Sequence, residues 1–288
     1  MQAFGAGTIP WRTTPLVLRV GVAIVVAHVL MAIFGSYLVA YGPGQMMTGL
    51  PLSGASLQHP FGVDQLGRDV FSRTVHGAGL VLTLSLSGTL LGFVIGTTVG
   101  LLCGYVGGWW DRVTMRIVEA LISIPTLFFA LLIVALISTR VVGSGTLIVA
   151  VIGFVYAPRV ARIARTAAIE IAITDYVQAA RLRGDRAWRV ATREILPNAI
   201  GTLSVEFALR SAYAPVLIAS LGFLGFGLQP PTPEWGLIIS ENRNLIYTTP
   251  ATVLGPGLVL ASLVIGINLM TEGTARMVGQ SAARVQST

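Results

Sequence analysis

YVQAARLRGDRAWRVATREILPN, residues 176–198, contains five arginines in a chain that is otherwise mostly apolar. Apolar and small side chains from Tyr176 to Leu182 form one face of a predicted short helix, while the arginines stay in water. Gly184 interrupts this helix, and a second amphipathic helix is predicted over 185–195 until Pro197 ends it. Such a segment is typical of a protein-docking surface; the alternative is that it lies on anionic lipid.

The composition around this stretch predicts an all-α polytopic membrane protein. Hydrophobic residues make up 54% of the 288 residues, and charged residues make up 11%. Several uncharged runs approach or exceed the roughly 20 residues that a helix needs to cross a bilayer. Six transmembrane helices are expected, at 16–41, 80–106, 117–137, 146–160, 200–227 and 253–270.

These spans divide the chain into an N-terminal tail with the first helix (1–41), an extracytoplasmic loop (42–79) and a core of five further helices (80–288). The loop 166–198 is rich in arginine, whereas the connection before the fourth span contains Arg140 alone. Cytoplasmic loops collect cations, so the loop 166–198 is predicted to be cytoplasmic. Because Arg12 precedes the first span and the number of crossings is even, both termini are expected to be cytoplasmic.

The first apolar run is too long for the apolar segment of a signal peptide. It is therefore expected to be an uncleaved anchor, with a cleaved signal as the alternative. The protein is expected to lie in membrane lipid as a multi-pass protein.

The basic residues exclude two classes of function. All 19 are arginine. Without lysine, the chain cannot supply the phosphate-binding lysine of a Walker A loop, so any ATP hydrolysis must come from a partner. The cations are not grouped on a solvent-exposed domain with interleaved aromatic residues, so nucleic acid is not expected as a partner.

Ionisable residues within the predicted spans are few. Glu206 and Arg210 lie four residues apart on one face of the fifth span, where an ion pair is expected and a substrate contact is the alternative. His28 is expected to be a packing residue. Kinks are expected at prolines within the spans, namely Pro125, Pro158, Pro215 and Pro256.

The second span contains glycine at every fourth position: Gly88, Gly92, Gly96, Gly100 and Gly104. This spacing lines one helical face with residues that have no side chain. A second backbone can approach such a face closely, so the stripe predicts tight helix packing; a lining of the translocation path is the alternative.

Three stretches together resemble the second permease subunit of dipeptide, oligopeptide and nickel ABC importers. They are HPFGVDQLGRDVFSRTVHGA at 59–78, YVQAARLRG at 176–184 and LGFLGFGLQPPTPEWG at 221–236, in the order that the family has them. Within the second region, the order of Ala179-Ala180, Gly184 and Leu196-Pro197 resembles the EAA motif by which such permeases engage their ATPases.

The resemblance implies the type I ABC importer permease fold, with a cytoplasmic coupling helix, and a location in a bacterial inner membrane. It also implies a homologous permease partner, two cytoplasmic ATPase subunits that bind ATP and Mg, and an extracytoplasmic solute-binding protein. No catalytic residue, metal site or cofactor is expected in this chain. Residues implied in ATPase coupling are Tyr176, Gln178, Ala179, Ala180, Arg183, Gly184, Leu196 and Pro197. Residues of the extracytoplasmic family motif are Gly62, Asp64, Gly67, Arg68, Asp69, Pro230, Pro231 and Trp235.

The chain departs from the family's pattern at several positions. Gln178 stands where the motif usually has glutamate, and Glu194 where the peptide branch often has histidine. Ile218 occupies a position where relatives often have glutamate, and the stretch TEGTARM at 271–277 fits the usual C-terminal pattern poorly. Peptides are the expected solute, and nickel or another small solute is the alternative.

Two functions of other classes are weighed against this expectation. An ion-coupled secondary transporter would need a carboxylate relay within the membrane, for which Glu206 could serve, and it often has repeated halves. An intramembrane hydrolase would need a nucleophile that faces a base, but His28 is accompanied by no Gly-Xaa-Ser-Xaa-Gly elbow.

Overall fold

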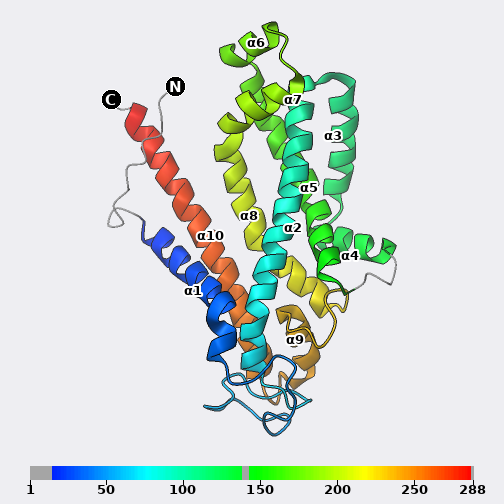
Figure 1. Cartoon of the computed structure of the whole chain (residues 1–288), viewed down its shortest axis with the longest axis vertical. Coiled ribbons are helices and arrows are strands. Elements are labelled where there is room, and N and C mark those ends of the chain that lie inside the picture. The colour runs from blue at the N-terminus through cyan, green and yellow to red at the C-terminus, as the bar shows by residue number, and fades with distance from the viewer. Residues whose placement is uncertain (1–14, 138–142, 287–288) are drawn as a thin grey trace.

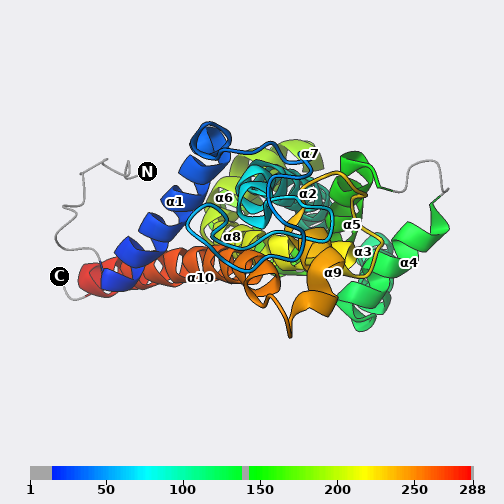
Figure 2. The same cartoon turned by 90° about the horizontal axis from the view of Figure 1, so that it is seen from below.

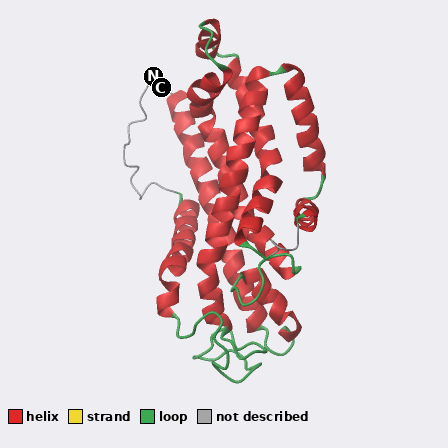
Figure 3. Ribbon diagram, turned by 45° about the vertical axis from the view of Figure 1, so that its right-hand side comes forward, coloured by secondary structure: helices red, strands yellow, loops and turns green. Residues whose placement is uncertain are grey.

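The computed structural model describes residues 15–137 and 143–286, and the regular structure within these ranges is helical (Figures 1 and 3). Arg12 and Arg140, on which part of the predicted orientation rests, lie outside the described residues. The helices are α1 Leu16–Leu38, α2 Val70–Val106, α3 Gly108–Ser123, α4 Thr126–Leu136, α5 Gly145–Ala172, α6 Asp175–Leu182, α7 Ala187–Val190, α8 Leu196–Phe223, α9 Trp235–Asn242 and α10 Ala251–Gln286.

Four of the described helices, α1, α2, α5 and α10, are long and apolar enough to cross a membrane. The pair α3 and α4 meets the same test only together, and the chain bends by 102° between them. The expected span 200–227 corresponds to α8, which is not among these candidates and contains Glu206 and Arg210. The chain is therefore a multi-pass membrane protein with four or five candidate spans, and the expected count of six is not confirmed.

The helices differ from the expected spans at two places. The second span was expected to begin at residue 80, but α2 begins at Val70, where the Asp69 side chain accepts a hydrogen bond from the Ser72 amide at 2.7 Å. This N-cap satisfies an amide that has no partner within the helix, which explains the early start. The third expected span is split, because α3 ends at Ser123 and Pro125 directly precedes α4.

The glycine stripe of α2 packs directly against the backbone of α5. A methyl group added at Gly96 would lie 2.5 Å from the carbonyl oxygen of Ala157, and one at Gly104 would lie 2.6 Å from that of Arg165. These distances are below any normal contact, so only glycine fits along this face. The prediction of tight helix packing is confirmed.

The helices α1 and α10 run side by side as an arm on one flank, and α4 projects on the other (Figures 1 and 2). The buried His28 of α1 joins this pair, because its Nε2 lies 3.1 Å from the Val259 carbonyl oxygen and 3.2 Å from the Ser262 hydroxyl. His28 is thus a packing residue, as expected. The two ends of the bundle differ: α6 caps one, while α9 and most of the loop structure lie at the other (Figure 3).

Candidate functional site

The protruding helix α6 lies at one end of the bundle and ends at a glycine (Figure 1). Gly184 has φ +78°, a backbone conformation that residues with side chains rarely adopt. A Cβ added at this position would have no neighbouring atom within 4 Å. The Gly184 amide donates to the Arg181 carbonyl at 3.0 Å, and the Asp185 amide donates to the Ala180 carbonyl at 3.2 Å. These bonds satisfy the last carbonyls of the helix, so the predicted interruption at Gly184 is confirmed.

One face of α6 is buried and the other is free. Val177 and Ala180 pack into an apolar cluster with α5 and with the segment that leads into α8. On the opposite face, Tyr176 and Ala179 are exposed, and Leu182 is 90% exposed. Of the alanine pair, only Ala179 is therefore available to a partner, while Ala180 holds the helix in place. Gln178, Arg183 and Gly184 are exposed as well.

The helical segment that follows α6 does not end at Pro197, where the sequence predicted its end. After α7, a π-helical turn over Ala191–Ile195 continues into α8, and Leu196 and Pro197 lie in the first turn of that helix. Pro197 was expected to end the helix, which is wrong. A proline in the first turn removes an amide that needs no partner within the helix, so it is tolerated there.

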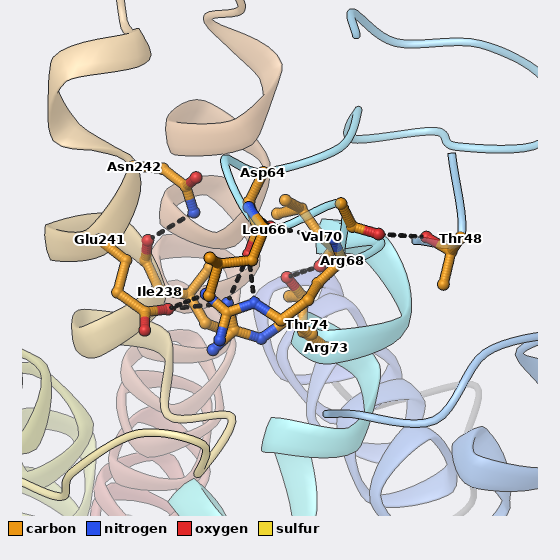
Figure 4. A network of polar contacts seen from close by, with 11 residues as sticks. Thr48, Asp64, Leu66, Arg68, Val70, Arg73, Thr74, Ile238, Glu241 and Asn242 are labelled. Atoms are coloured by element: carbon orange, nitrogen blue, oxygen red, sulfur yellow. Dashed lines mark hydrogen bonds and ion pairs between the residues drawn. The ribbon is translucent and has the colours of Figure 1, made fainter. Parts of the chain in front are cut away.

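At the opposite end, a buried network of charged side chains joins the loop before α2 to α9 (Figure 4). Asp64 lies 2.6 Å from Arg68 and 3.1 Å from Arg73. Glu241 of α9 bonds the same two arginines, at 3.0 Å to Arg68 and 2.7 Å to Arg73. Two carboxylates therefore share two guanidinium groups, which compensates charges that would otherwise be costly to bury.

Other residues of the same family motif are also internal. Asp69 accepts a hydrogen bond from the His59 ring at 2.9 Å, and the Trp235 indole donates to the Thr74 carbonyl at 2.8 Å. Gly62 and Gly67 have φ of +78° and +72° and form the turns of the loop. Buried residues of this kind shape the surface rather than touch a partner. Of the predicted motif residues, Pro230 and Pro231 are the ones whose side chains are exposed.

Glu234 was not identified from the sequence, although it begins α9 at this end. Its carboxylate accepts hydrogen bonds from the amides of Gly236 at 2.7 Å and Leu237 at 2.8 Å. Burial raises the pKa of Glu234 to about 7, because desolvation outweighs the two amide bonds that favour the charged form. The acidic residue at the helix start is the sequence signal that could have identified this cap.

The predicted ion pair in α8 is confirmed, with Arg210 Nε 2.6 Å from Glu206 Oε1. The Arg210 guanidinium also lies 5.9 Å from the centre of the Tyr156 ring of α5. Arg210 and Tyr156 border a cavity of about 400 Å³, which lies between the start of α4, α5 and α8. A second arginine in its wall, Arg159, was not identified from the sequence as a site residue, because its spacing from Arg210 does not indicate that the two line one cavity.

Residues 96–284 match the family described as binding-protein-dependent transport system inner membrane component. The chain is 33% identical to the dipeptide transport system permease protein of Alkalihalophilus pseudofirmus over 270 residues, which cover 92% of this chain and 88% of that protein. It is 37% identical to the glutathione transport system permease protein of Pectobacterium atrosepticum over 220 residues, covering 76% and 72%. The corresponding glutathione permease of an Escherichia coli strain is 36% identical over 250 residues, covering 86% and 81%.

The family match begins within α2 and covers α5, the α6 protrusion and the α8–α9 segment described above. They confirm the resemblance and with it the expectation of a non-catalytic transport subunit, for which ATP is bound by partner subunits. The chain therefore belongs to the family of inner-membrane components of binding-protein-dependent transport systems, as a permease subunit of an ABC importer.

Proposed function

We propose that this chain forms half of the translocation pathway for peptides, with the α6 end docked on cytoplasmic ATPase subunits. The observation that supports this most directly is α6 itself, an exposed helix that the buried Val177 and Ala180 anchor to the bundle. Peptides are favoured as the solute because the relatives are named as permeases for dipeptides and for glutathione, which is itself a small peptide.

The assembly that we propose contains a homologous second permease subunit, two ATPase subunits and an extracytoplasmic solute-binding protein. At the α6 end, the exposed residues Tyr176, Gln178, Ala179 and Arg183 would contact an ATPase, and Gly184 would let the chain turn there. Ala180, Leu196 and Pro197 would position that surface from behind. At the α9 end, the exposed Pro230 and Pro231 would lie on the side of the binding protein.

The proposed topology has six crossings and places both termini in the cytoplasm. It counts the bent pair of α3 and α4 as one crossing and α8 as another, despite the charges in α8. The start of α1 and the end of α10 both point toward the α6 end of the bundle, which supports this arrangement (Figure 1).

Cysteine labelling tests the orientation, because Cys103 is the sole cysteine of the chain. In a Cys103→Ala background, Leu182→Cys and Leu57→Cys place one exposed thiol at each end. A membrane-impermeant maleimide added to intact spheroplasts is expected to label the Leu57 variant and to spare the Leu182 variant. The reverse pattern would overturn the proposed topology.

Docking is tested by replacing Leu182 with glutamate, which should prevent copurification of the ATPase subunits and abolish uptake. The matched control is Leu57→Glu, the same change at a fully exposed leucine of the opposite end, which should leave ATPase copurification intact. Ala180→Glu is unsuitable, because the buried side chain would disturb the fold of the chain itself. Full copurification with Leu182→Glu would contradict the role of α6.

A further inference from the structure

The cavity between the start of α4, α5 and α8 has a positively charged wall. Its volume is about 400 Å³, and its polar lining includes Arg159, Arg210, Tyr156, Tyr213, Thr126 and Ser220. Arg159 and Arg210 lie near the middle of two 28-residue helices, α5 and α8. In the proposed topology, in which both helices cross the membrane, the cavity is at the level of the bilayer interior.

The charges of this cavity do not balance. Arg210 is paired with Glu206 at 2.6 Å, whereas the bond of Arg159 is to a neutral group, the Thr126 hydroxyl at 2.8 Å. Thr126 and Leu127, the first residues of α4, also line the cavity, and the start of a helix adds partial positive charge. Glu206 therefore neutralises about one of the two arginine charges, and the cavity keeps a net charge of about +1.

The cavity is open on the surface of this chain rather than enclosed. Tyr213 in its wall is 53% exposed, and both arginines are partly exposed. A charged side chain that faces hydrocarbon is costly, so arginines at this depth face a bundle interior or a water-filled path. The open side is thus suited to a permease partner and the path between the two chains.

We infer that this cavity binds the carboxylate of the solute as it crosses the membrane, with Arg159 as the principal contact. The inference rests on the proposed function and narrows its solute to molecules with an anionic group, such as the C-terminus of a peptide. Arginine binds a carboxylate through two parallel N–H groups, and Tyr156, Tyr213 and Ser220 offer hydroxyls beside it. A nickel ion would meet net positive charge here, so the cavity opposes the alternative solute.

Thiol-reactive probes of opposite charge measure the field of the cavity without any transport. Ser220→Cys in the Cys103→Ala background places a thiol in the wall. The measured quantity is the ratio of two reaction rates, that of the anionic sulfonatoethyl methanethiosulfonate over that of the cationic trimethylammonium reagent. We expect this ratio to be at least about fivefold higher at Ser220→Cys than at Leu57→Cys. Arg159→Gln should abolish this preference, and Arg159→Lys should retain it.

The matched control is Arg162→Gln, which removes the same charge one turn further along α5 from an exposed residue outside the cavity. It should leave the preference unchanged, whereas an equal effect of both glutamine variants would overturn the inference. Melting temperatures of all variants, measured in detergent, show whether the chain remains folded. The same ratio of anionic to cationic reaction rates at Ser220→Cys and at Leu57→Cys would also overturn it.

Uptake of radiolabelled alanyl-alanine by proteoliposomes with the whole complex separates this inference from the proposed function. Arg159→Gln is expected to reduce uptake at least tenfold while Arg162→Gln leaves it unchanged. If the parent complex does not import alanyl-alanine although the reagent preference is present, the peptide proposal fails and the anion-binding cavity stands. If import occurs and Arg159→Gln does not alter it, the cavity is not the carboxylate site.

Discussion

Gln178 donates a hydrogen bond from its side-chain Nε2 to the backbone carbonyl oxygen of Ala172, at 2.8 Å. Ala172 is the last residue of α5 and Gln178 lies in α6, so this bond closes the turn between the two helices. It requires an N–H donor, which an ionised glutamate cannot provide. The departure from the EAA pattern at this position therefore has a local structural role.

Replacing Gln178 with methionine removes the donor at similar side-chain length. We expect the backbone amides of α6 to exchange severalfold faster with solvent, because one such bond contributes about 0.5–1.5 kcal/mol. Hydrogen exchange followed by mass spectrometry measures this, and Gln178→Lys, which keeps a donor, serves as the control. Unchanged exchange would show that other bonds of the turn suffice, such as that from the Thr174 hydroxyl to the Ile171 carbonyl.

Replacing Gly96 with leucine should separate α2 from α5. The new side chain would overlap the Ala157 carbonyl and the Val160 side chain, and overpacking of this kind costs about 1–3 kcal/mol or more. The measurement is the melting temperature in detergent. Gly201→Leu, in the exposed part of α8 where nothing lies within 4 Å, is the matched control and should melt like the parent. Equal melting of the Gly96 variant would refute the close approach.

Glu234 predicts a pH dependence of stability. Its pKa is about 7 in the folded chain against an ordinary value of 4.5, so the folded state holds the proton more tightly than the unfolded state. This contribution is fully present below pH 4.5 and is lost as the pH rises through 7. Thermal unfolding across that window should therefore show a falling melting temperature. Glu234→Gln, which carries no charge, should flatten the fall, and a parallel decline in both proteins would exclude Glu234 as its cause.

The shared ion-pair network predicts unequal effects of its two carboxylates. The Asp64 side chain is 2% exposed and also accepts backbone amide bonds from Leu66 and Arg68, whereas Glu241 is 20% exposed. Removing one partner of a buried pair costs about 3–5 kcal/mol. We expect Asp64→Asn to approach that loss and Glu241→Gln to fall below it, as measured by denaturant unfolding. The opposite order would place the main charge compensation on α9.

The sequence predicted the all-helical class, the interruption at Gly184 and the contact face of α2, because each depends on local rules. Helix length, glycine conformation and a four-residue period are visible along the chain. The ion pair of Glu206 and Arg210 was predictable for the same reason, since both residues lie on one helix.

Features that depend on distant residues were not predictable. Nothing near Arg159 in the sequence indicates that it shares a cavity with Arg210, because the packing of α5 against α8 brings them together. The same limit applies to Arg73 at the start of α2 and Glu241 of α9, which meet as an ion pair at 2.7 Å. Asp64 and Trp235 were expected only as residues of the extracytoplasmic family motif; that they are buried was not predictable, because a motif shows which residues occur and not which way they point.

The glycine stripe packs α2 and α5 into one rigid pair of helices. Their backbones touch along its length, so one helix cannot slide past the other without a clash. Since α5 leads into α6 after two residues and contains Arg159, we expect a displacement of α6 to move α5 and α2 together. In the proposed assembly, a movement of α6 by an ATPase would therefore reach the cavity beside Arg159 through the backbone of α5 rather than through side chains alone.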